Sequence, residues 1–200
     1  PPWPLEPDDL ARFFQQIEAG VEFRLAFEEL LCELSLEKAE HLMLMTRQGR
    51  AAWIPLLRTP TGRALVLGNA FSGAGPGLAQ AGWAVSIRDD CPERLAFAQA
   101  RAADLGLELQ TELSQGEREL PHAEESFDLV LKEGAVNTEI SELSRVARGE
   151  VVLIVDNRYA YKRSVGVHGE FEVRSPFEYL RSLFSSEGES LADYSKQLKQ

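Results

Sequence analysis

The 200-residue sequence has few residues suited to metal ligation. It contains two cysteines, Cys32 and Cys91, and three scattered histidines, His41, His122 and His168. No pair among them has the short spacing of a zinc site, so we expect no bound metal. Two distant cysteines allow one disulfide, but so low a number is more typical of a reduced cytoplasmic protein, which is the location we predict.

Long hydrophobic runs are also missing. The longest strong run covers residues 151–155, far short of the roughly 18 residues that a membrane-spanning helix needs. The first residues show neither a basic segment nor an apolar segment of the kind found in signal peptides. We therefore expect neither a membrane span nor a signal peptide.

Positive charge is scarce. The chain has 21 Lys and Arg against 32 Asp and Glu, a net charge of −11, and residues 61–156 hold half of the acidic groups. Binding to phosphate backbones needs a basic face, so free nucleic acid is not expected as a partner. An apolar content of 44% is high enough for a folded core.

Residues 1–60 have helical periodicity, and we predict that they form an N-terminal helical cap. Leu10, Phe13, Phe14 and Ile17 fall on one helix face, and Gly20 is a stop signal. A second helix is expected over 23–34, a third after Ser35, and a short fourth over 51–57. Residues 60–62, Pro-Thr-Gly, form a turn and the predicted boundary to a second domain, 61–200.

From residue 61 onward, short apolar runs alternate with helical patterns. Strands are predicted over 64–67, 85–87, 107–111, 127–131 and 151–155, and helices over 92–105 and from 140 to near Gly149. Two further helices are expected after Ser175 and Ser190. This alternation predicts an α/β fold, a Rossmann-like, mostly parallel sheet with helices on both faces.

A glycine-rich loop follows the first predicted strand. It reads Gly-Asn-Ala-Phe-Ser-Gly-Ala-Gly from Gly68 to Gly75, and the second strand ends at Asp89. Glycine allows close backbone approach to a ligand, and a carboxylate at the next strand end can accept both hydroxyls of a ribose. The alternative that these glycines only form a turn and that Asp89 is a solvated acid at a strand end stays open.

With these residues, the stretch from Arg63 to Asp156, about half of the chain, resembles the class I S-adenosylmethionine-dependent methyltransferases. The residues that match are Ala-Leu-Val-Leu-Gly at 64–68, Asp89 with Cys-Pro-Glu-Arg-Leu at 91–95, Ser-Phe-Asp-Leu-Val at 126–130, and residues 143–149 before the fifth strand. The resemblance implies S-adenosylmethionine bound over residues 68–73. The implied cofactor-binding residues are Gly68, Asn69, Ala70, Gly73, Asp89 and Asp90.

The sequence also departs from the family pattern. Val66 stands where the family has an acid, and Ala70 and Ser72 stand at the second and third glycine positions. The family sheet has two strands after the fifth that are not recognisable here, so the sheet is expected to be incomplete at its C-terminal side, or completed by a partner protein or a second copy.

The resemblance implies methyl transfer to a small-molecule or glycan acceptor. Candidate substrate residues are Glu133, Asn137, Arg158, Tyr159 and Lys162. Each of them is also consistent with a solvent-exposed position that has no role in binding. His168 is expected to lie in an exposed loop. No catalytic residue is assigned. The alternative is a catalytically inactive methyltransferase-like scaffold or partner-binding subunit. A third reading, an NAD(P)-dependent short-chain-type oxidoreductase, lacks the Tyr-x-x-x-Lys pair of that family.

Overall fold

The computed structural model describes residues 5, 7–47, 51–116, 119–133 and 138–154, and two short strands beyond them. Contacts divide the chain into two units near residue 153, and each is treated by itself. In the second unit, β6 (Val167–His168) and β7 (Glu172–Val173) form an antiparallel pair. His168 thus lies in a strand, where we expected a loop. The helices predicted after Ser175 and Ser190 lie outside the described residues.

The N-terminal segment forms three helices, as expected. They are α1 (Pro7–Glu18), α2 (Phe23–Glu33) and α3 (Leu36–Thr46). Gly20 follows α1 with a φ of +82°, which suits a glycine at a helix end. The Ser35 hydroxyl accepts a hydrogen bond from the Lys38 amide at 3.4 Å and so caps α3.

The fourth predicted helix, over 51–57, is wrong in extent. Only a short 3₁₀ turn, η2 (Ile54–Leu56), forms there. Pro55 lacks an amide hydrogen and cannot donate the bond that would continue an α-helix.

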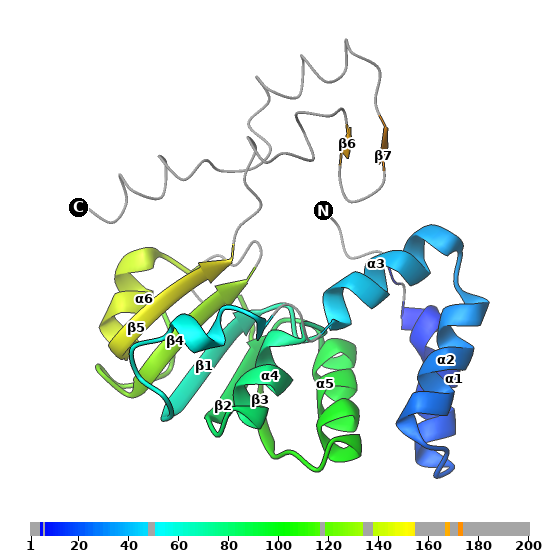
Figure 1. Cartoon of the computed structure of the whole chain (residues 1–200), viewed down its shortest axis with the longest axis horizontal. Helices are drawn as coiled ribbons and strands as arrows, with labels where there is room; N and C mark the ends of the chain where they lie inside the picture. Colours follow the sequence, from blue (N-terminus) through cyan, green and yellow to red (C-terminus); the bar gives the residue numbers. More distant parts are fainter. Residues whose placement is uncertain are drawn as a thin grey trace. The chain divides into compact units, whose positions relative to one another are not determined.

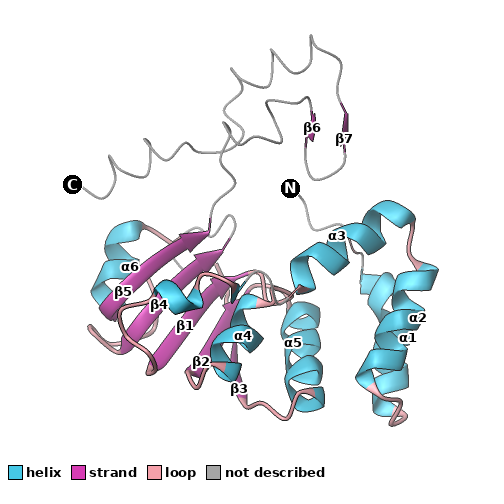
Figure 2. Ribbon diagram, viewed as in Figure 1, coloured by secondary structure: helices cyan, strands magenta, loops and turns pink. Residues whose placement is uncertain are grey.

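Five strands form one parallel sheet in the order β3-β2-β1-β4-β5 (Figures 1 and 2). They are β1 (Arg63–Gly68), β2 (Ala84–Asp89), β3 (Leu109–Leu113), β4 (Phe127–Glu133) and β5 (Ala147–Ile154). The helices between them are α4 (Ala74–Gln80), α5 (Pro92–Asp104) and α6 (Ile140–Val146). The predicted Rossmann-like α/β fold is therefore confirmed.

Two strand boundaries differ from the predictions. β3 starts at Leu109 because its register is set by pairing with β2, where Val85 lies opposite Leu109. β5 starts at Ala147, four residues earlier than predicted, and α6 ends at Val146. The polar residue Glu150 lies within this strand, and its carboxylate accepts the backbone amides of Arg58 and Thr59, at 2.8 and 3.2 Å.

Side chains alternate across the sheet and meet different helices on its two faces. Gly75 of α4 lies close to Ile87 of β2, while Leu143 and Val146 of α6 share a core with Leu65 of β1. Helices therefore cover both faces of the sheet, as Figure 2 also shows.

The N-terminal helices share their core with the outer side of α5. Phe97 of α5 is fully buried, and its ring lies 4.6 to 5.8 Å from those of four other phenylalanines: Phe13, Phe23, Phe27 and Phe71. Leu10, Leu30 and Leu42 belong to the same buried cluster. The helical cap and the sheet thus lie in one compact unit with a shared core; the domain boundary near residue 60 stays a prediction.

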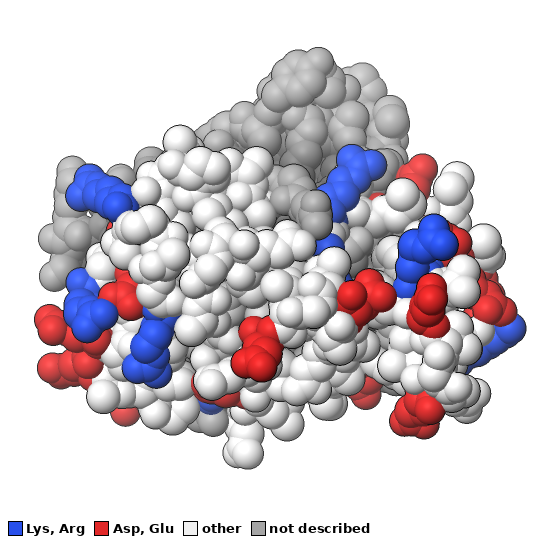
Figure 3. Space-filling view, turned by 60° about the horizontal axis from the view of Figure 1, so that its bottom comes forward, with Lys and Arg blue, Asp and Glu red and all other residues white. Residues whose placement is uncertain are grey.

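Charges on the surface of this unit are mixed in sign. On the face seen in Figure 3, acidic and basic side chains lie near one another on both sides of the described part. Arg12 pairs with Glu29 and Glu33, and Arg148 pairs with Asp128. Among the described helices, none is long and apolar enough to cross a membrane.

Candidate cofactor site

The candidate site lies at the carboxyl end of β1. The chain moves from β1 outward to β2 and β3, then returns to form β4 on the other side of β1. Ligands of open α/β sheets bind at such a switch point. Gly68 closes β1 with a φ of +104°, a conformation that favours glycine, and leads into the loop 69–73 before α4.

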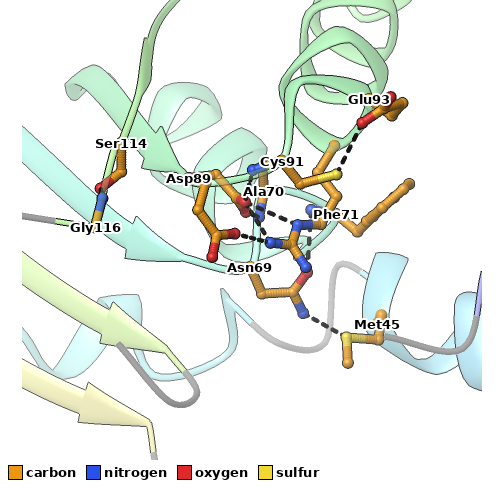
Figure 4. Close-up of polar contacts among 11 residues, drawn as sticks. Met45, Asn69, Ala70, Phe71, Asp89, Cys91, Glu93, Ser114 and Gly116 are labelled. Carbon is orange, nitrogen blue, oxygen red and sulfur yellow. Dashed lines mark hydrogen bonds and ion pairs between the residues drawn. The ribbon is translucent and has the colours of Figure 1, made fainter. Parts of the chain in front are cut away.

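Asp89, at the end of β2, reaches this loop (Figure 4). Its Oδ2 accepts the Ala70 amide at 2.8 Å, and its Oδ1 accepts the Cys91 amide at 2.9 Å and Arg94 Nε at 2.8 Å. The side chain has no exposed surface. Burial raises the pKa of Asp89, against the lowering caused by these donors.

Arg94 is a partner that we did not anticipate. It lies five residues after Asp89, in the first turns of α5, and also pairs with Asp90. Asp90 itself is exposed. Among the described residues, Asp89 therefore hydrogen-bonds to the glycine-rich loop, whereas the contact seen for Asp90 is with Arg94.

The backbone amides from Ala70 to Ala74 are all hydrogen-bonded within the chain. Beyond the Ala70–Asp89 bond, the amides of Phe71 and Ser72 donate to Asn69, at 3.2 Å to its Oδ1 and 3.0 Å to its carbonyl. The Ala74 amide donates to the Ser72 hydroxyl at 3.1 Å. The Gly73 amide donates to the Met45 carbonyl of α3.

The C-terminal end of α3 lies on Gly73. The Gly73 amide donates to the Met45 carbonyl at 3.0 Å, and a Cβ added at Gly73 would lie 2.1 Å from the Arg47 carbonyl oxygen. Asn69 Nδ2 contacts Met45 Sδ (Figure 4). Glycine is needed at this position because the backbone of α3 occupies the space where a side chain would begin.

Phe71 is directed into the core that the loop shares with the N-terminal helices. Its side chain is fully buried, and its ring centroid lies 4.6 Å from that of Phe97. The loop residues Ala70, Ser72 and Ala74 are at most 3% exposed. Gly68 and Asn69 are only half-buried.

The predicted substrate residues are described only in part. Glu133 ends β4 opposite Gly68 in the register and is 4% exposed. Outside the described residues lie the other four, Asn137, Arg158, Tyr159 and Lys162. Their role in substrate binding stays a prediction.

S-adenosylmethionine is the cofactor that the resemblance implies here, and the residues fit it by type and placement. Gly68 ends β1 at the switch point in a conformation that favours glycine, and the Asp89 carboxylate accepts the Ala70 amide of the loop. The loop from 70 to 74, however, is closed by contacts with the chain itself.

Three groups that hold the loop in this closed arrangement were not predicted from the sequence: the end of α3, Arg94 and Arg101. Arg101 of α5 donates to the Thr46 carbonyl at 2.5 Å. Only Arg94 had a local signal, since it lies one helical turn after Asp90. Nothing in the sequence relates Arg101 to Thr46, 55 residues away.

No protein-family model and no curated protein matches the sequence. Solved structures do. A protein from Galdieria sulphuraria assigned as a sarcosine dimethylglycine methyltransferase superimposes with a TM-score of 0.51 at 16% identity, over 84% of this chain and 64% of that one. A SAM-dependent methyltransferase from Aquifex aeolicus gives a TM-score of 0.48 at 17% identity, over 72% and 87%.

At these identities the likeness concerns the fold, and the chain spans less than two thirds of the Galdieria protein. The strand order, the glycine-rich loop after β1 and the acid at the end of β2 agree with it. This chain therefore has the Rossmann-like fold of the class I S-adenosylmethionine-dependent methyltransferases.

Proposed function

We propose that this chain binds S-adenosylmethionine at the loop after β1 and transfers its methyl group to a small-molecule or glycan acceptor. The observation that carries the proposal is the 2.8 Å hydrogen bond between Asp89 and the Ala70 amide. This bond holds the carboxylate at the end of β2, a position from which an acid can accept ribose hydroxyls, against a glycine-rich loop at the switch point of the sheet.

In this proposal the loop residues Gly68, Asn69, Ala70 and Gly73 lie under the cofactor. Asp89 accepts the ribose hydroxyls. Asp89 Oδ1 is now bound to Arg94, so the hydroxyls would replace the guanidinium as donors. Asp90 is then a neighbour of the site rather than a ligand, because it is exposed and pairs with Arg94.

When bound, S-adenosylmethionine supplies a methyl group on a positively charged sulfur, which is a good leaving group. The protein then needs mainly to hold the acceptor in line and, for a hydroxyl or amine acceptor, to take up its proton. Glu133 is the acid that we propose for this role, because it is buried and lies opposite Gly68 across the β1–β4 pair. The residues that we propose to bind the methyl acceptor are Asn137, Arg158, Tyr159 and Lys162.

Calorimetric titration with S-adenosylhomocysteine, the demethylated product, tests the cofactor. Asp89→Asn keeps the size of the side chain and removes its charge, and we expect at least a tenfold loss of affinity. Asp90→Asn is the matched control, from the next residue and the same Arg94 partner, and should stay within about twofold of wild type. Equal affinities for both variants would refute the ribose assignment.

A catalytically inactive, partner-binding domain is the second candidate, and the closed loop favours it. Every amide from Ala70 to Ala74 is already satisfied within the chain. If neither wild type nor a variant with an opened loop binds millimolar S-adenosylmethionine or S-adenosylhomocysteine, this candidate replaces the enzyme.

A further inference from the structure

The end of α3 is bound by two groups of the sheet domain. A helix leaves its last carbonyls without intrahelical donors. In α3 the Met45 carbonyl receives the Gly73 amide at 3.0 Å, and the Thr46 carbonyl receives Arg101 Nη2 at 2.5 Å. The cofactor loop and α5 therefore act together as the C-terminal cap of this helix.

Arg101 is well suited to hold this end. It lies in the last turn of α5, and its other terminal nitrogen, Nη1, is buried with no hydrogen-bond partner found among the described residues. A cation at a helix C-terminus is favourable, and a buried guanidinium depends on the acceptors it has. Separating α3 from the loop would thus cost both the Thr46 and the Met45 contacts.

We propose that residues 45–47 are an intrachain latch, held by Arg101, which closes the cofactor loop. This inference rests on the proposed function. In the latched state the Gly73 amide is engaged and the Arg47 carbonyl lies where a side chain on Gly73 would begin. A ligand that needs the loop binds the unlatched state only, so its apparent affinity is reduced by the fraction of molecules that are unlatched.

Arg101→Met tests the latch because it keeps an apolar stem and removes the donor. Titrated with S-adenosylhomocysteine, this variant should bind about tenfold more tightly than wild type, since the lost hydrogen bond involves a charged group. The matched control is Lys38→Met. Lys38 also ties α3 to another helix, through Asp9 at 2.6 Å, but at the end of α3 remote from the loop. Its affinity should remain within twofold of wild type.

Hydrogen exchange of the Gly73 amide gives a second readout that needs no ligand. Exchange should accelerate at least fivefold in Arg101→Met and remain unchanged in Lys38→Met. Should Arg101→Met fail to fold, Arg101→Lys keeps the charge and should show a smaller increase in both measurements.

The outcomes separate the two proposals. Faster Gly73 exchange with no ligand binding in any variant upholds the latch and refutes the proposed cofactor. Binding that is equally tight in wild type and Arg101→Met, or Gly73 exchange that does not change, overturns the latch.

Discussion

The phenylalanine cluster around Phe97 predicts that the N-terminal helices and the sheet unfold together. Phe97 is fully buried and contacts one ring from α1, two from α2 and Phe71 of the glycine-rich loop. Replacing it by alanine leaves a cavity between three helices and the loop. Such a substitution costs about 3–5 kcal/mol, and we expect the upper half of this range because ring pairs add about 0.5–1.5 kcal/mol each beyond burial.

The assay is urea unfolding of wild type, Phe97→Ala and Phe97→Leu, followed by far-ultraviolet circular dichroism and by tryptophan fluorescence. Phe97→Leu retains most of the apolar volume and should lose about 1–2 kcal/mol. Both probes should report one transition, because the buried apolar residues described in α1 and α2 belong to the same cluster as Phe97 of α5. A loss below about 1.5 kcal/mol for Phe97→Ala, or separate transitions in the wild type, would refute the shared core.

The remaining predictions concern two glycines and one acid. Gly149→Ala should cost about 2–3 kcal/mol in urea unfolding because its Cβ would lie 2.2 Å from the Asp128 carbonyl oxygen. Gly106 has a φ of +65°, and a Cβ added there would meet no atom within 4 Å, so Gly106→Ala should lower the unfolding free energy by only about 1 kcal/mol. Equal losses of stability in the two variants would contradict the packing at Gly149. The Arg63 amide and the Arg148 guanidinium lower the pKa of Asp128. Its ionised form therefore stabilises the folded state above the ordinary value of 3.8, and this stability is lost as the pH falls through the lowered pKa. Asp128→Asn should be about 1 kcal/mol less stable than wild type at pH 7 and equally stable near pH 2; a difference that persists at pH 2 would argue against this pair.

Most of the fold could be predicted because its signals are local. The periodicity of residues 10–17 and the apolar runs at 64–67 and 127–131 identify a helix and two strands that the structure confirms. Errors occurred where partners are remote. β5 begins earlier than predicted and includes the polar residue Glu150, whose carboxylate accepts the amides of residues 58 and 59; no periodicity contains that pairing.

For the candidate site, the sequence identified the glycine-rich loop and Asp89, since both follow strands that end at the same edge of a parallel sheet. It did not identify what binds them. The sequence places Phe71 in this loop but does not show where its ring lies, and in the structure the ring packs against Phe97 in the N-terminal core. The role of Asp89 toward a ribose stays a prediction.

The sequence by itself determined the order of strands and helices, the parallel sheet and the edge of that sheet at which a ligand would bind. These follow from backbone propensities and from spacing along the chain. Only the tertiary structure decided that the loop amides are already satisfied, that α3 ends on Gly73, and that Arg94 and Arg101 secure this arrangement. The physical reason is that a backbone amide donates to any suitably placed acceptor, so its partner is chosen by how the helices pack.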